Sequence, residues 1–154
     1  MSDDQLRQEF QQISNEIQRY DEYGKQLQVQ VETLQNYLVD LNRSKTTLAS
    51  LKEEKTPEET LIQLGSGVMM RVKPLEIDNV LYSVGAGVVV KKPIDDAIKS
   101  VEERIEEVEK ERLAITDQLS RIIESIGNLE RKGQAIYRQL QGPSKPQYDP
   151  NLVS

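Results

Sequence analysis

Carboxylate pairs in the second half of the chain are the first candidates for acid–base chemistry. They stand at Asp95-Asp96, Glu102-Glu103 and Glu106-Glu107. Two carboxylates can act as general acid and general base when a shaped, partly dry site holds them. We expect these pairs at surface positions of a helix without a pocket around them, so an enzyme is the weakest interpretation. The sequence contains no histidine and no cysteine, which excludes Cys/His zinc sites, disulfides and thiolate nucleophiles.

Two Gly-x-Gly motifs, Gly65-Ser66-Gly67 and Gly85-Ala86-Gly87, raise the question of phosphate binding. A dinucleotide fingerprint needs a third glycine and runs from a strand into a helix, whose N-terminus then meets the phosphates. Here each motif lies between two runs of β-forming residues and lacks the third glycine. We therefore expect no nucleotide, no other cofactor and no metal.

Composition narrows the range of partners further. The sequence has 26 acidic and 20 basic residues, a net charge of −6, and no basic block longer than Lys91-Lys92. Nucleic-acid binding needs clustered positive charge that displaces counterions from phosphates, so we expect no nucleic-acid partner. No apolar run approaches the ~20 residues of a membrane span. The first residues, MSDDQLRQEF, are acidic and polar, unlike a signal peptide, so we expect a soluble cytoplasmic protein away from the membrane.

Two long heptad seams must position all other features. Mostly apolar residues alternate at spacings of four and three, which over about six heptads is typical of a coiled coil. The first seam consists of Leu6, Phe10, Ile13, Ile17, Tyr20, Gly24, Leu27, Val31, Leu34, Leu38, Leu41, Lys45 and Leu48. The second consists of Ile94, Ile98, Val101, Ile105, Val108, Arg112, Ile115, Leu119, Ile122, Ile126, Leu129, Gly133, Ile136 and Leu140.

Two seams of equal length on one chain most simply fold back on each other as an antiparallel pair. Gly24 and Gly133 stand equally far from the bond between Asp78 and Asn79, as do Lys45 and Arg112. We therefore expect the two glycines to lie near each other, and the two basic residues likewise. Thr56-Pro57 is the expected end of the first helix, because the residue before proline avoids the α region.

Between the helices, β-type residues predict four strands at about 60–64, 68–73, 80–84 and 88–92. We interpret each Gly-x-Gly motif as a three-residue hairpin loop. Apolar residues occur on both faces of the hairpins, and a sheet edge leaves backbone groups unpaired, so the hairpins predict a joint between subunits. The expected interface residues are Leu61, Ile62, Leu64, Val68, Met69, Met70, Val72, Val80, Leu81, Tyr82, Val84, Val88, Val89 and Val90. A self-contained four-stranded cap is the alternative.

The predicted fold is therefore mainly α with a small β part. It has a coiled-coil helix at 5–56, two β-hairpins at 57–93, a second coiled-coil helix at 94–141 and a disordered, proline-rich tail at 142–154. The two helices form a long antiparallel coiled-coil hairpin. We expect the β-hairpins to contribute to an intersubunit β-barrel or to a sheet that other subunits close.

This order of elements, with a second hairpin that reads VGAGVVVKKPIDDAI, resembles the α-class subunit of prefoldin, most closely the archaeal form. The doubled hairpin is typical of the α class. The resemblance implies a heterohexamer of two α-type and four β-type subunits, whose hairpins form a double β-barrel platform that carries six coiled-coil tentacles. It also implies capture of unfolded polypeptides without ATP and their delivery to a group II chaperonin.

In such an assembly both ends of this chain lie at the free tips of the coiled coil. Terminal turns of a coiled coil fray, and frayed turns expose apolar side chains that hold unfolded chains. The expected client-binding residues are Leu6, Phe10, Ile13, Ile17, Ile136, Tyr137 and Leu140. The alternative is that these residues are only the last buried layers of the seam.

Other classes of function stay open on the sequence alone. The second interpretation is a structural or tethering coiled coil, in which the hairpins join subunits and no client is bound. A polymerase-channel factor is a further interpretation. In such a factor the acidic turn that connects the two helices inserts into the channel, whereas the segment that connects the helices here is apolar and β-forming, so we favour this interpretation less.

Overall fold

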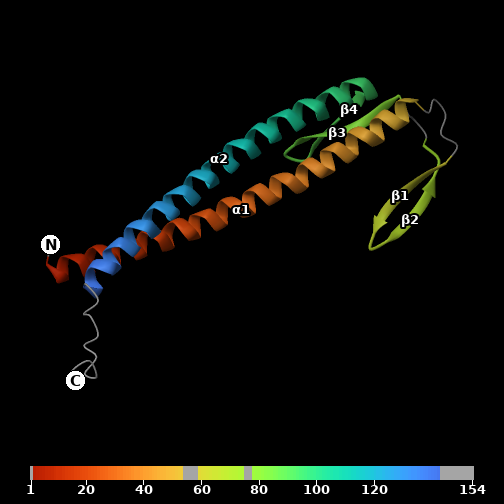
Figure 1. Ribbon diagram of the computed structural model, residues 1–154. Coiled ribbons are helices and arrows are strands. Elements are labelled where there is room, and N and C mark those ends of the chain that lie inside the picture. Colours follow the sequence, from red (N-terminus) through yellow and green to blue (C-terminus); the bar gives the residue numbers. More distant parts are fainter. Residues whose placement is uncertain (1, 54–58, 75–77, 143–154) are drawn as a thin grey trace, which may run out of the picture. The chain divides into compact units, whose positions relative to one another are not determined.

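The computed structural model describes residues 2–53, 59–74 and 78–142 of the chain. Two long helices flank four strands in the order α1 (Asp3–Glu53), β1 (Thr60–Gly65), β2 (Val68–Val72), β3 (Asn79–Gly85), β4 (Val88–Pro93) and α2 (Ile94–Gln141) (Figure 1). This confirms the mainly α fold with two β-hairpins. The predicted helix end at Thr56-Pro57 and the tail from residue 143 onward lie outside the described residues.

Local hydrogen bonds explain where the helices begin and end. At the start of α1, the Ser2 N–H donates to Gln5 Oε1 at 3.0 Å and the Gln5 N–H donates to Ser2 Oγ at 3.4 Å. This reciprocal capping box satisfies donors that a helix N-terminus leaves without partners. The N–H of Ile94, the first residue of α2, donates to the Asp78 carbonyl oxygen at 3.0 Å. Beyond α2, Gly142 adopts a φ of 67°, the left-handed cap for which glycine is suited.

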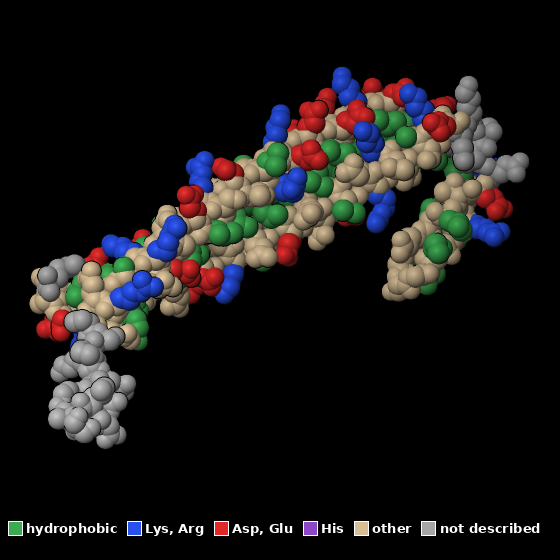
Figure 2. Space-filling view, viewed as in Figure 1, with side chains coloured by type: hydrophobic (Ala, Val, Ile, Leu, Met, Phe, Trp, Pro, Cys, Tyr) green, Lys and Arg blue, Asp and Glu red, His purple; other side chains and the backbone are tan. Residues whose placement is uncertain are grey.

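The heptad seams form the core of the protein. Every predicted seam position in α1 and α2 is buried or half-buried, and nearly all positions between them are exposed. Leu27 and Val108 are among the most buried, at 2% and 1% exposure. Figure 2 shows hydrophobic side chains along the line where the helices meet, with Lys, Arg, Asp and Glu outside it. The coiled-coil interpretation is therefore confirmed.

The helices pair in antiparallel register within each of two compact units. The first unit, called the helix-end unit below, comprises Met1–Val31 and Ala114–Ser154. In it, Lys132 Nζ lies 3.0 Å from Glu9 Oε1. Gly24 faces Ile122 in the same unit. Residues late in α2 therefore meet residues early in α1.

The second unit, Glu32–Leu113, contains the hairpins and the adjoining parts of both helices. Ion pairs join its two helices: Lys45 Nζ lies 3.1 Å from Glu102 Oε1, and Lys52 Nζ lies 2.6 Å from Asp95 Oδ1. The α1 residue number rises from Lys45 to Lys52 while the number of its α2 partner falls from Glu102 to Asp95. The helices are therefore antiparallel here, as they are in the helix-end unit.

The predicted register is wrong by about two heptads. Gly24 packs against Ile122 and Leu119, and Gly133 packs against Ile13, so the glycines do not meet each other. Lys45 likewise pairs with Glu102 rather than lying beside Arg112. A repeating seam determines which face turns inward, but it is compatible with any shift of whole heptads. The observed shift places a bulky side chain opposite each glycine, which fills the space that the missing side chain leaves.

Each β-hairpin forms its own two-stranded antiparallel sheet. Gly65 pairs with Val68 and Gly85 pairs with Val88, so the loops contain two residues, not the three predicted. The first loop residues, Ser66 and Ala86, both have a φ of 50°. Both residues of each loop thus have positive φ, as in a type I′ turn, whose twist matches that of the strands. The predicted strands agree with the observed ones to within one residue at each end.

Replacing Gly24 by alanine should stabilise the protein. A Cβ at this position would lie 3.5 Å from Ile122 Cγ2, an ordinary van der Waals contact, and glycine inside a helix costs about 1 kcal/mol relative to alanine. We expect the free energy of unfolding in urea to rise by about 0.5–1 kcal/mol at fixed protein concentration. Gly127→Ala, where the added Cβ would meet nothing within 4 Å, measures helix propensity alone. A fall in stability for Gly24→Ala only would mean that the helices are closer there than described.

Candidate functional site

The apolar cluster at the helix ends contains the residues predicted to contact clients. Leu6, Ile13 and Ile136 form its centre, each 5–6% exposed. Partly buried side chains that pack against this centre are Phe10, Ile17, Leu129 and Leu140. Tyr137 differs from the other predicted residues because it is 52% exposed. The structure thus brings all seven predicted residues to one region, with three of them inside the helix pair; their role in client binding stays a prediction.

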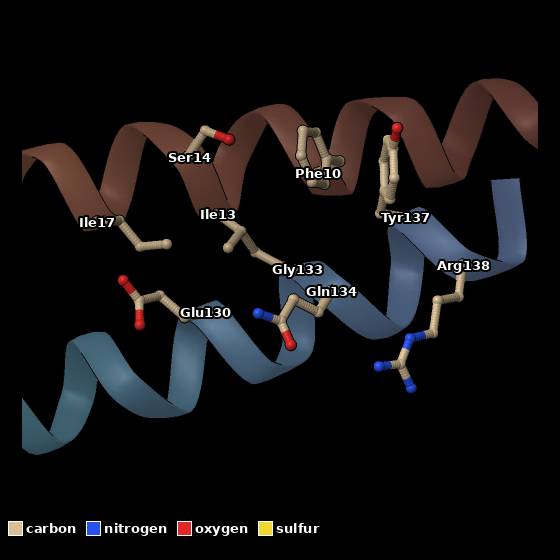
Figure 3. A pocket seen from close by; sticks show the side chains of 9 residues that line it. All are labelled: Phe10, Ile13, Ser14, Ile17, Glu130, Gly133, Gln134, Tyr137 and Arg138. Atoms are coloured by element: carbon tan, nitrogen blue, oxygen red, sulfur yellow. The ribbon is translucent and has the colours of Figure 1, made fainter. Parts of the chain in front are cut away.

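A groove opens on one side of this cluster. It has a volume of about 470 Å³ and is lined by Phe10, Ile13, Ser14, Ile17, Glu130, Gly133, Gln134, Tyr137 and Arg138. We call it the Gly133 groove. Figure 3 shows the rings of Phe10 and Tyr137 beside each other at one end, and their centroids are 6.2 Å apart at an interplanar angle of 37°. This tilted arrangement leaves an aromatic edge beside open space.

Gly133 and Ser14 explain why the groove exists. Gly133 faces Ile13 and Phe10 without a side chain of its own, so α2 adds little bulk at that layer. Ser14 is the small side chain that α1 contributes to the lining. Sequence reasoning treated Gly133 as a break in the seam and did not single out Ser14 or Glu130. A serine beside the seam of one helix and a glycine in the seam of the other were a usable signal, but only once the register was known.

The opposite side of the seam is closed by an ion pair. Glu9 and Lys132 each come one residue before a seam residue, and their charged groups lie 3.0 Å apart. Ser14 and Tyr137 come one residue after a seam residue. In a heptad, these two kinds of position flank opposite sides of the seam. The helix-end unit therefore has one bridged side and one grooved side.

The hairpins form a second candidate surface, which carries the residues predicted to contact other subunits. The predicted interface residues that are exposed are Leu61, Ile62, Leu64, Val68, Met69, Met70, Leu81, Val84, Val88 and Val89. The others, Val72, Val80, Tyr82 and Val90, are half-buried. In β1–β2 both faces contribute exposed apolar residues, because Ile62 pairs with Met70 and Gln63 with Met69 on alternate faces. The role of all these residues in assembly stays a prediction.

One face of β3–β4 is already occupied within its own unit. Lys92 Nζ lies 4.5 Å from the centre of the Tyr82 ring and donates to Ser100 Oγ of α2 at 2.8 Å. On the neighbouring helix surface, Arg104 Nε donates to the Tyr37 hydroxyl oxygen at 3.4 Å. The hydrogen bond to Tyr37 is the main cause that raises the pKa of Arg104 above its usual value. The hydrogen bond between Lys92 and Ser100 attaches the second hairpin to α2. Leu81, at 76% exposure, lies on the outer face.

Three residues of the carboxylate pairs form ion pairs with basic side chains in the described part of the chain. Asp95 is bound to Lys52, and this hydrogen bond raises the pKa of Lys52. Glu102 and Glu107 form ion pairs with Lys45 and Arg104. Across residues 2–53, 59–74 and 78–142, no three acidic side chains gather as they would around a metal ion. Neither described helix contains an apolar stretch long enough to cross a membrane.

The fold and its two apolar surfaces define a class of coiled-coil subunit in which a pair of β-hairpins separates two heptad helices. The family model described as Prefoldin subunit matches residues 20–139. Prefoldin subunit alpha 2 from Thermococcus kodakarensis is 32% identical over 136 residues, which cover 88% of this chain and 96% of the relative. Prefoldin subunit alpha from Methanopyrus kandleri is 28% identical over 118 residues, covering 77% and 75%.

Solved structures show the same fold. The chain is similar to one in the cryo-EM structure of filamentous PFD from Methanocaldococcus jannaschii, with a TM-score of 0.65 and 23% identity, covering 77% of this chain and 98% of that one. The chain belongs to the prefoldin family, and it resembles the archaeal α class within it. The resemblance inferred from the sequence is thereby confirmed. Prefoldin is a family of chaperones, so the protein is a chaperone subunit.

Burial separates the structural residues of the helix ends from the surface ones. Replacing Ile13 by alanine should lower the free energy of unfolding by about 2–4 kcal/mol, because its side chain is 5% exposed in the centre of the cluster. Tyr137→Ser should cost about 1 kcal/mol or less, because half of that side chain is in water and its main loss is the ring contact with Phe10. Urea unfolding at fixed concentration measures both. Equal losses for the two variants would contradict the described burial.

Proposed function

We propose that this chain is the α-type subunit of an ATP-independent holdase that binds unfolded polypeptides at its helix ends. The observation that carries this proposal is the open Gly133 groove, with aromatic rings at its edge on a chain of a chaperone family. Unfolded chains expose large apolar side chains, and an exposed apolar surface bordered by polar residues is suited to bind them.

The predicted client-binding residues fall into two groups by burial. Phe10, Ile17, Leu140 and Tyr137 are exposed or half-buried, so a client contacts them first. The buried residues, Leu6, Ile13 and Ile136, become available only when the last turns of the helices separate. Local opening of terminal turns costs little free energy compared with global unfolding. The surface group therefore provides the initial contact and the buried group an additional one.

The β-hairpins assemble the subunits. Exposed apolar residues on both faces of β1–β2 and on one face of β3–β4 support burial against other chains. Two-stranded sheets are marginally stable alone, and their edges can pair with further strands. The partners we propose are four β-type prefoldin subunits and a second copy of this chain, joined in a double β-barrel. Several weak client sites on one assembly then act together through their effective concentration.

The downstream partner that we propose is a group II chaperonin, which receives the bound client in the cytoplasm. The acidic excess of the chain is compatible with docking on a basic partner surface. We assign no residues to this contact. The tethering alternative shares the same hairpin assembly, so client holding is what distinguishes the two functions.

A double variant, Phe10→Ser with Tyr137→Ser, tests the holdase function. Removing both rings takes away the aromatic end of the Gly133 groove, so we expect suppression of client aggregation to fall at least about threefold per assembly. Light scattering of a chemically denatured protein, diluted into the assembled chaperone, measures this loss. Val29→Ser with Val39→Ser is the matched control, because both valines are exposed and lie away from the groove.

Native mass spectrometry of the same samples shows whether assembly is preserved. We expect a defined heterohexamer with the β-type partner for the wild type and for both double variants. Wild-type protein that assembles but does not suppress aggregation would support the tether instead. Full holding by the ring variant would mean that clients bind elsewhere.

A further inference from the structure

The Gly133 groove has a charged end as well as an aromatic one. Figure 3 shows the Glu130 carboxylate beside Ile17, at the end opposite the rings of Phe10 and Tyr137. Within the described part of the chain, Glu130 forms no ion pair or hydrogen bond with another side chain. The groove therefore offers an unpaired negative charge next to an apolar surface.

The remaining charges around the seam do not neutralise Glu130. Arg138 is the one basic side chain in the groove lining, and Figure 3 shows its guanidinium at the aromatic end, directed away from α1. Lys132, two residues after Glu130 and six before Arg138, is held by Glu9 on the bridged side of the seam, where their charged groups lie 3.0 Å apart. A positive group that approaches along the groove therefore meets Glu130 without a competing cation from the lining.

The chemistry of the two ends defines the occupant. An aromatic or large aliphatic side chain gains buried area and ring contacts against the exposed edges of Phe10 and Tyr137. A neighbouring lysine or arginine in the same segment would meet the Glu130 carboxylate, and its aliphatic stem would cover Ile17. An aspartate or glutamate in that place would meet a like charge.

We propose that the Gly133 groove selects segments of unfolded polypeptide in which a large apolar side chain lies next to a lysine or arginine, with the apolar side chain at the Phe10–Tyr137 end and the basic one at Glu130. This inference rests on the proposed holdase function and adds a preference to it. Because exposed charge pairs are weak, the preference is modest for one groove. The two copies of this chain in the proposed assembly supply two such grooves, which together strengthen the preference.

Three short, labelled Gly-Ser peptides test the preference by fluorescence anisotropy with the assembled chaperone. The first carries Phe residues each followed by Lys, the second has Glu in place of Lys, and the third has Ala in place of Phe. We expect the Phe-Lys peptide to bind about two- to fivefold more tightly than the Phe-Glu peptide at low salt. The Ala-Lys peptide should bind more weakly than both. The advantage of Lys over Glu should shrink as salt is added.

Two variants, each with a matched control, locate the effect. Glu130→Gln removes the charge with little change of shape and should abolish the Lys-over-Glu preference. Glu109→Gln changes another exposed glutamate three heptads earlier on α2, also without a described partner, and should preserve the preference. Ser14→Lys places a cation across the groove from Glu130 and should weaken binding of the Phe-Lys peptide about threefold or more. Gln8→Lys adds the same charge at an exposed position outside the lining and should not.

Each result decides the proposal. Equal binding of the Phe-Lys and Phe-Glu peptides, or a preference that survives Glu130→Gln, would overturn it even if the protein still holds denatured clients. In that case the holdase function stands and the selectivity does not. If the wild-type assembly binds no Phe peptide and fails to suppress aggregation, the proposed function fails and the selectivity fails with it.

Discussion

The apolar seam between α1 and α2 is the interaction on which the rest of the structure depends. It brings the early part of α1 against the late part of α2 in the helix-end unit, and the hairpin-proximal parts together in the other unit. A bulky residue lies opposite each of the two seam glycines, Ile122 at Gly24 and Ile13 at Gly133. Because long helices in water gain most of their stability from such packing, losing the seam would remove both proposed binding surfaces.

The Gly133 groove exists because different residues lie on the two sides of this seam. On one side Glu9 and Lys132 bridge the helices, and on the other Ser14 is too small to reach across. The buried residues at the centre of the cluster support the rings of Phe10 and Tyr137 at the edge of the groove. Residues that stabilise the helix pair and residues proposed to bind clients therefore lie within a few neighbouring layers. This division suits a holdase that binds many different unfolded chains, because its binding surface can stay exposed while the residues of the core remain buried.

The sequence predicted the features that rest on a repeated pattern, such as the seam positions, and did not predict the register in which the two helices pair. Heptad spacing identified the seam positions, and β-forming residues around the Gly-x-Gly motifs identified four strands. The register was predicted wrongly because any shift by whole heptads preserves the pattern. Placing Gly24 opposite Gly133 would also bring two residues without side chains together, which gives no packing contact. The loop length failed because Ser66 and Ala86 accept positive φ, which residue type alone did not indicate. The groove depends on that register and therefore could not be found beforehand.

A cross-linking measurement tests the register most directly, since the chain contains no native cysteine to interfere. Glu9→Cys with Lys132→Cys places two thiols where the described ion pair lies, whereas Tyr23→Cys with Lys132→Cys matches the register with facing glycines. The two α1 positions are about 21 Å apart along the helix, well beyond the reach of a short bis-maleimide. We predict rapid intramolecular cross-linking of the pair at positions 9 and 132 and none of the pair at positions 23 and 132. Cross-linking of the second pair instead would contradict the described register, and with it the groove at Gly133.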